Sequence, residues 1–164
     1  MRFMSAMFWK AVFAFVALPG TVAFVVPLTV FLPRSPIVLD RSGLVLVLLG
    51  VTLLLSTVRE FYVAGRGTLA PWSPPGELVT TGLYSYSRNP MYVAVVLVLL
   101  GWSALFHSSA LLVYAAAVAA AFHLRVVFGE EPWLAQTHRG SWLRYSAQVP
   151  RWFGFANNGR GVTP

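Results

Sequence analysis

The stretch 84–92 gathers hydroxyl, amide and guanidinium groups directly before a long apolar run. Pro90 suits the first turn of a helix, and Ser87 or Asn89 could cap that helix. Arg88 would then lie beside the positive end of the helix dipole, where a guanidinium can receive a carboxylate or a phosphate. The alternative, which this stretch favours when taken alone, is that Arg88 anchors the membrane topology and the tyrosines form an interfacial belt.

A second polar group, Glu130 and Glu131, follows the next apolar run. Two carboxylates after a helix C-terminus oppose the helix dipole, so one interpretation is that they face a cationic or hydroxyl ligand. The other is that Gly129 breaks the helix and that the two acids and Pro132 begin a new one. For His123 we expect a hydrogen bond between helices, and we predict no metal site because no partner stands at ligand spacing.

These two polar groups should meet, because a short turn at residues 107–108 joins the intervening apolar runs into an antiparallel hairpin. One charged mouth is therefore expected, made by Arg88, Tyr92, Arg125, Glu130 and Glu131. An amino acid moiety needs a cationic partner for its carboxylate and an anionic partner for its amine. The pairing thus predicts a site for a zwitterionic ligand.

Apolar helices must position this mouth. The chain is 57% hydrophobic and 10% charged, with a mean hydropathy of +0.70, whereas a soluble domain carries roughly a quarter charged residues. Four apolar segments, 8–32, 43–63, 91–106 and 109–128, predict an all-α, polytopic membrane protein with about four transmembrane helices. The lipid bilayer is then its first partner. Prolines within the first segment predict a kink.

The basic residues predict the orientation. With the N-terminus inside, two of the 12 Lys and Arg residues, Arg34 and Arg41, fall outside and the rest fall on the cytoplasmic side. We therefore predict both termini in the cytoplasm, in a bacterial-style plasma membrane. Residues 132–145 predict an amphipathic interfacial helix anchored by Trp133, Trp142 and Tyr145. Residues 153–164 are predicted to be a disordered tail.

Composition excludes several kinds of chemistry. Without cysteine there are no disulfides, thiolate metal sites or thiol nucleophiles. The net charge of +7 is spread over single basic residues rather than a stripe, so no nucleic-acid partner is expected. No G-x-G-x-x-G turn opens a helix after a strand, which argues against a Rossmann domain. A small transporter and a non-catalytic membrane partner remain alternatives to an enzyme.

The region 76–152 resembles the isoprenylcysteine carboxyl methyltransferase and phospholipid methyltransferase family of integral membrane enzymes. The family pattern Leu-Val-Thr-x-Gly-x-Tyr-x-x-x-Arg-(His/Asn)-Pro-x-Tyr is present at 78–92, Glu-Glu-x-x-Leu at 130–134, and Tyr-x-x-x-Val-Pro-Arg at 145–151. Two departures stand out. Ala94 replaces the family's usual glycine, and Phe-Gly-x-x-Tyr reads His138-Arg139-Gly140-Ser141-Trp142, with the glycine displaced by one. The first two helices, in 1–63, carry no family signature, and we treat the chain as one domain.

The resemblance implies a methyltransferase that uses S-adenosylmethionine as its cofactor. By resemblance, the cofactor pocket is lined by Gly76, Glu77, Leu78, Val79, Tyr84, Asn89, Pro90, Met91 and Tyr92, and closed by Glu130 and Glu131. The catalytic candidates are Arg88 and Arg125, of which Arg125 would position an acceptor carboxylate or phosphate. The acceptor would be lipidic or small and hydrophobic. Prenylcysteine carboxylates, phospholipid amines and hydrophobic thiols or acids all remain open, as does the oligomeric state.

Overall fold

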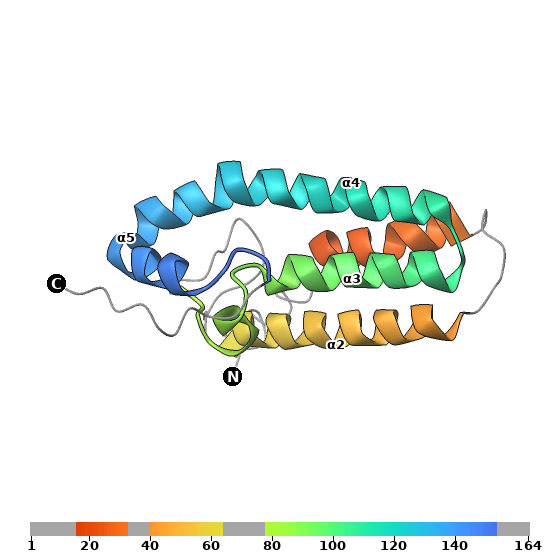
Figure 1. Ribbon diagram of the computed structural model, residues 1–164, viewed down its shortest axis with the longest axis horizontal. Coiled ribbons are helices and arrows are strands. Elements are labelled where there is room, and N and C mark those ends of the chain that lie inside the picture. Colours follow the sequence, from red (N-terminus) through yellow and green to blue (C-terminus); the bar gives the residue numbers. More distant parts are fainter. Residues whose placement is uncertain (1–15, 33–39, 64–77, 154–164) are drawn as a thin grey trace, which may run out of the picture.

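The computed structural model describes residues 16–32, 40–63 and 78–153, and within these ranges the regular secondary structure is entirely helical. Three long helices lie side by side: α2 (Arg41–Val63), α3 (Pro90–Leu105) and α4 (Ser109–Arg125) (Figure 1). A tight turn at His107 joins α3 to α4, as expected from the short connection. The predicted all-α fold is confirmed, and the helix bounds lie within a few residues of the expected ones.

The N-terminal segment packs against α3 and α4 through two π-helical stretches, η1 (Val16–Val25) and η2 (Pro27–Phe31). Pro19 and Pro27 lack the N–H that an α-helix needs, which accounts for widened turns here. The indole of Trp102 donates to the carbonyl of Ala23 at 2.9 Å, and the hydroxyl of Tyr114 donates to that of Val22 at 3.3 Å. These bonds satisfy part of the interrupted backbone. The start of the expected first segment, at residue 8, lies outside the described residues.

Glycines bring α2 and α3 into close contact. A Cβ atom on Gly43 would lie 2.2 Å from the backbone nitrogen of Leu105, and one on Gly50 would lie 2.7 Å from Cγ2 of Val98. Because both distances are far below van der Waals contact, only glycine allows this approach. Small residues at such positions are typical of helix packing within membranes.

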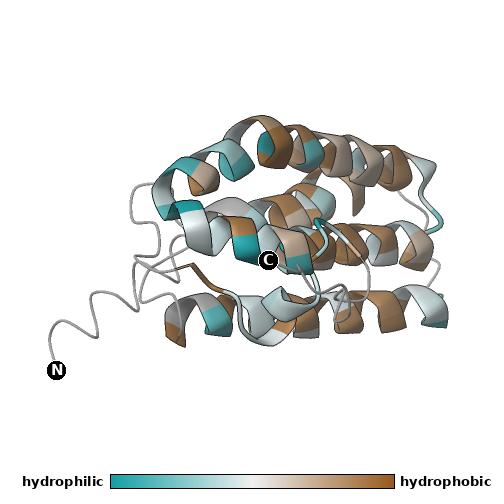
Figure 2. Ribbon diagram, turned by 60° about the vertical axis from the view of Figure 1, so that its left-hand side comes forward, coloured by the Kyte–Doolittle hydropathy of each residue, from teal (hydrophilic) through white to brown (hydrophobic). Residues whose placement is uncertain are grey.

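The outer surface of the bundle is apolar along its length. Val45, Leu48 and Val113 are 62%, 57% and 69% exposed, which indicates a surface that faces lipid rather than water. Two helical stretches, Arg41–Glu60 and Ser109–Gln148, are long and apolar enough to cross a membrane, and two shorter apolar helices accompany them. Figure 2 shows hydrophobic residues through the long helices and hydrophilic ones around α5. The chain is a membrane protein.

The helix of α4 does not end at Gly129. It passes through the π-helical turns of η5 (Val126–Glu130) into α5 (Glu131–Gln148), which has Pro132 in its first turn. A non-helical residue, Arg139, with φ 34° and ψ −107°, bends α5 back toward the bundle. Arg139 occupies the place where the family pattern carries its glycine, so the displaced glycine leaves an arginine in a left-handed conformation.

The predicted interfacial anchors of α5 are partly wrong. Trp142 and Tyr145 are only 6% and 7% exposed and pack with Val149, so they are core residues that hold α5 against the bundle. Trp133, in contrast, is 45% exposed. The apolar side of the second half of α5 therefore faces the protein and not the lipid.

Candidate functional site

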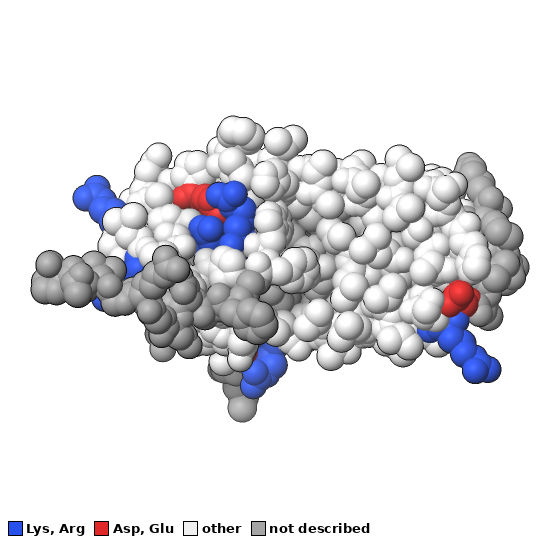
Figure 3. All heavy atoms as spheres, viewed as in Figure 1, with Lys and Arg blue, Asp and Glu red and all other residues white. Residues whose placement is uncertain are grey.

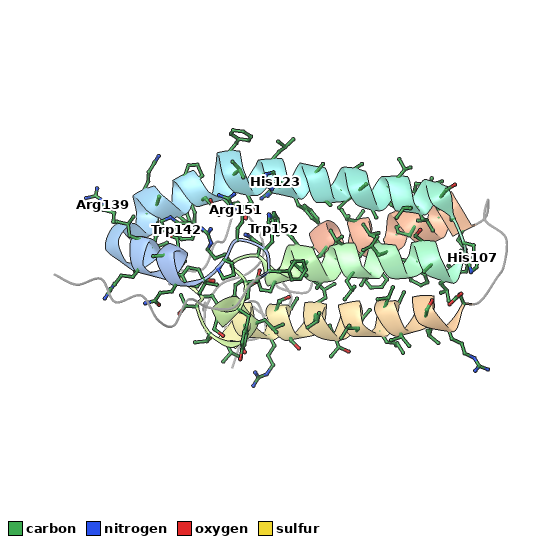
Figure 4. All side chains as sticks on the ribbon, in the orientation of Figure 1. His107, His123, Arg139, Trp142, Arg151 and Trp152 are labelled. Carbon is green, nitrogen blue, oxygen red and sulfur yellow. The ribbon has the colours of Figure 1, made fainter. Side chains whose placement is uncertain are left out.

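The site lies at the end of the bundle where α3 begins and α4 passes into α5, which we call the charged end. Figure 3 shows acidic and basic side chains meeting there, whereas the flank of the bundle in the same view is free of them. Side chains from the loop before α3, from α4, from α5 and from the segment after α5 converge at this end, as Figure 4 shows for His123, Trp142, Arg151 and Trp152.

The loop before α3 is fixed to α2 and α5. Gly82 has a φ of +59°, and a Cβ atom there would lie 2.7 Å from the Glu60 carboxylate, so the motif's glycine has a steric reason. The short helix η4 (Gly82–Ser85) follows, and its Tyr84 is buried. The Tyr145 hydroxyl donates to the Tyr84 carbonyl at 2.7 Å. Burial raises the pKa of the Tyr84 phenol well above its ordinary value, so it stays neutral.

The start of α3 corrects one expectation. Asn89 is the N-cap residue and Pro90 occupies the first turn, but neither Asn89 nor Ser87 caps the helix through its side chain. Instead the Asn89 amide nitrogen Nδ2 donates to the carbonyl of Arg151 at 3.0 Å, and Ser87 Oγ accepts from the Asn89 N–H at 3.2 Å. The polar side chains of the motif therefore bind the segment after α5.

Arg88, Glu131 and Arg151 form the first of two ion-pair groups, which we call the Glu131 cluster. Arg151 binds the Glu131 carboxylate in a bidentate ion pair, with Nε donating to Oε1 at 2.8 Å and Nη2 donating to Oε2 at 2.7 Å. Arg88 Nη1 lies 3.0 Å from the same Oε1. The side chains of Arg88 and Glu131 are 13% and 15% exposed. Hydrogen bonding to Glu131 raises the pKa of the Arg151 guanidinium above its ordinary value.

Arg88 has a further feature. Its guanidinium lies 5.4 Å from the ring centroid of Trp142, which gives a cation–π contact. Its Nε is buried and is the one such side-chain polar atom without a hydrogen-bond partner among the described residues. An unsatisfied buried donor is costly, and it marks a place where an acceptor atom fits.

Tyr92, Arg125 and Glu130 form the second group, the Glu130 cluster. The Tyr92 hydroxyl donates to Glu130 Oε1 at 2.5 Å, and Arg125 Nε donates to the same oxygen at 2.7 Å. Arg125 Nε also lies 3.1 Å from the Tyr92 hydroxyl. The Tyr92 ring stacks on Phe122 with centroids 4.3 Å apart. The Arg125 side chain is 53% exposed, so it can reach a ligand from the surface.

The segment after α5, residues 150–152, contacts both the loop before α3 and the Glu131 side chain, and we call it the strap. The N–H of Arg88 donates to the Pro150 carbonyl at 2.9 Å, and the Arg151 carbonyl accepts from Asn89. Trp152 Nε1 donates to His123 Nδ1 at 3.3 Å with the two rings stacked. His123 therefore forms a hydrogen bond, but its partner Trp152 lies in the segment after α5 and not, as had been expected, on another helix.

The other predicted pocket residues are distributed differently. Gly76 and Glu77 lie outside the described residues. Leu78 packs on the Trp142–Tyr145–Val149 cluster, Val79 is buried, and Met91 packs against the central core. These three side chains therefore pack in the apolar interior beneath the charged end.

The sequence correctly predicted that the five residues of the charged mouth lie at one end of the bundle. It did not predict their division into the Glu131 cluster and the Glu130 cluster. It gave no role to Arg151 or Trp152, and it predicted an interfacial anchor at Trp142. The available signal was the Tyr-x-x-x-Val-Pro-Arg stretch itself, which places a proline and a lone arginine shortly after the predicted 132–145 helix.

The apolar bundle and its charged end together define a class: a small, all-helical membrane protein with a polar site at one end of its bundle. The family model for phospholipid methyltransferases matches residues 39–140, more than half of the chain, and the chain belongs to that family. The match includes both Arg88 and Glu131 and ends before the strap. No curated protein and no solved structure matches the chain.

Proposed function

We propose that this chain is a methyltransferase that uses S-adenosylmethionine and methylates a lipidic or small hydrophobic acceptor. The observation that carries the proposal is the Glu131 cluster, in which two guanidiniums share one carboxylate and Arg88 keeps a buried, unsatisfied Nε. A site with a surplus cation beside an anion suits the amino acid head of that cofactor. Family membership supports methyl transfer as the reaction class.

The residues of the charged end fit the cofactor chemically. Arg88 and Arg151 can hold a carboxylate, Glu131 can hold an ammonium group, and the stacked Tyr92 and Phe122 rings offer a face for a sulfonium cation. The cofactor supplies an electrophilic methyl group, and the protein supplies orientation and a dry site. Glu130 would keep the Tyr92 ring in place through the hydrogen bond to its hydroxyl.

Arg125 is proposed to position the acceptor. Its side chain is half exposed and its guanidinium is held by Glu130 and Tyr92, so its direction is fixed while part of the side chain stays accessible. A carboxylate or phosphate of the acceptor could bind there, while the apolar remainder of the acceptor stays against the outer faces of the helices. The distribution of Lys and Arg supports placing the charged end and both termini in the cytoplasm, in a plasma membrane.

The first test is binding of labelled S-adenosylmethionine to the protein in lipid nanodiscs. Arg88→Ala and Glu130→Ala should each weaken binding at least tenfold, and Arg144→Ala, which removes an exposed arginine of α5, should not. Saturable binding with that pattern supports the cofactor site. A folded wild-type protein that binds no S-adenosylmethionine would overturn the proposal and favour a non-catalytic membrane relative.

A second measurement separates the roles. Once an acceptor is found, Arg125→Ala should raise the KM for the acceptor by roughly tenfold or more and leave cofactor affinity nearly unchanged. If turnover and acceptor affinity are both unaffected, the role given to Arg125 is wrong.

A further inference from the structure

We propose that Arg151 is a ligand-binding residue, and that its ion pair with Glu131 exchanges for the head of the cofactor: the ligand's carboxylate takes Arg151 and its ammonium takes Glu131. This inference rests on the proposed function and deepens it. Arg151 lies beyond the residues that the family model matches, and its assignment comes from the geometry of the strap.

Charge balance is the first argument. The Glu131 cluster has two positive groups and one negative group, both arginines contacting the same carboxylate. Its net charge of about +1 is partly buried, since the side chains are between 13% and 36% exposed. A zwitterion can insert between Arg151 and Glu131 so that every charge keeps a partner, whereas a neutral ligand would leave two charges separated.

The attachment of the strap is the second argument. Its main chain is held by Arg88 and Asn89, which bind the carbonyls of Pro150 and Arg151, and by a weaker contact of Ser87 Oγ with the Arg151 carbonyl at 3.4 Å. None of these bonds involves the Arg151 guanidinium. The side chain can therefore change partner while the backbone that carries it stays in place.

Exposure is the third argument. The Arg151 side chain is 36% exposed, compared with 13% for Arg88. Arg88 is stacked over Trp142 and is held on that side. Arg151 is thus the arginine whose side chain can move at low cost. Arg88 stays in place and continues to pair with Glu131 during the exchange.

The test compares two ligands in nanodiscs: S-adenosylmethionine and its decarboxylated analogue, which keeps the sulfonium and an ammonium but lacks the carboxylate. The wild-type protein should prefer S-adenosylmethionine by roughly 10- to 100-fold, the range expected for a charge-assisted bidentate contact. Arg151→Gln should reduce that preference to a few-fold. It should leave binding of the decarboxylated analogue unchanged or tighter, because Arg151 no longer competes for Glu131.

Binding of the analogue by Arg151→Gln also reports that the variant is folded. Arg151→Lys keeps the positive charge but loses the bidentate geometry of the guanidinium. Its preference for S-adenosylmethionine over the analogue should lie between those of the wild type and Arg151→Gln. Arg144→Gln is the matched control and should behave as wild type.

Three results would overturn the inference. If Arg151→Gln weakens both ligands equally, Arg151 only supports the fold, and if the preference is kept, the carboxylate binds elsewhere. If the substitution changes only the effect of adding anionic lipid to the nanodisc, the surplus charge serves a lipid phosphate. In each case the proposed function survives, because S-adenosylmethionine still binds. If the wild type binds neither ligand, the proposed function fails and the inference fails with it.

Discussion

The two ends of the bundle carry polar groups of different kinds. At the far end, Asp40 Oδ1 accepts from the Ser42 N–H and hydroxyl at 2.7 and 2.5 Å, and Asp40 Oδ2 lies 3.2 Å from His107 Nε2. The His107 and Asp40 side chains are 55% and 36% exposed. At the charged end, Arg88 and Glu131 are 13% and 15% exposed, and the carboxylate has two cationic partners.

This difference separates structural polarity from polarity that can serve a ligand. The Asp40 group caps the start of α2 and joins it to the turn after α3, so each of its contacts has a local structural purpose. The Glu131 cluster draws on three separate segments, holds an excess of positive charge and leaves a buried donor unsatisfied. A fold gains nothing from such an excess alone, which is why the charged end is the candidate site.

Glu131→Ala should give the largest loss of stability, because it leaves Arg88 buried without its anion. Removing one partner of a buried ion pair costs about 3–5 kcal/mol. The thermal midpoint of purified protein in detergent measures the effect. Glu130→Ala is the control and should cost less, since its partner Arg125 is half exposed. Equal losses would mean that the two clusters do not differ in the way described.

Gly43→Ala tests the far half of the bundle, where packing and not charge dominates. The added Cβ would lie 2.2 Å from the Leu105 nitrogen, so α2 and α3 must separate, at about 1–3 kcal/mol. The matched control is Gly129→Ala, whose Cβ would have no neighbour within 4 Å. We expect a lower thermal midpoint for the first variant only, with S-adenosylmethionine affinity retained in both. A loss of S-adenosylmethionine affinity in folded Gly43→Ala would contradict the claim that the two ends of the bundle act independently.

Arg139→Gly should stabilise the protein by about 1 kcal/mol, because it relieves a left-handed conformation at an exposed residue. Glycine also restores the family pattern at this position. The thermal midpoint should rise, with ligand affinity unchanged, and Arg144→Gly in a regular part of α5 should lower it instead. An unchanged or lowered midpoint for Arg139→Gly would show that the bend is not strained.

Asp40→Asn should have the smallest effect, visible in its pH dependence. Hydrogen bonds from Ser42, and then from His107, lower the pKa of Asp40 from 3.8 to about 2. Its contribution to stability is therefore complete above about pH 4 and is lost as the pH falls toward 2. The difference in thermal midpoint between wild type and variant should shrink over that window and with added salt. A difference that stays constant from pH 5 to 2 would contradict this role.

Much of the fold was predictable because the bilayer imposes simple rules on composition. Apolar runs located α2, α3 and α4, and the short turn at His107 fixed the hairpin that brings Arg88 near Glu131. Periodicity could not show that α4 continues through Gly129, because a glycine in a widened turn has the same local signal as a helix end. The burial of Trp142 was missed because an aromatic residue beside charged ones fits a membrane interface equally well.

The partner choices within the charged end were beyond sequence reasoning. Glu130 and Glu131 are adjacent, and their helical positions point them to different arginines, a result that depends on the path of η5. Arg151 joins Glu131 only because the bend at Arg139 returns α5 to the bundle. Such contacts follow from the three-dimensional path of the chain rather than from residue spacing.

The close register of α2 and α3 has a consequence for how a lipid would be handled. With Gly43 against Leu105 and Gly50 against Val98, the same register carries Pro90 to the level of Val58, while α2 continues to Val63. The start of α3 is therefore recessed by about 8 Å below the end of α2. Pulling an acyl chain out of its leaflet costs about 0.8 kcal/mol per methylene. With α2 spanning the membrane to its end, the start of α3 would lie that far below the membrane surface, and a lipid acceptor would reach it with correspondingly less extraction from its leaflet.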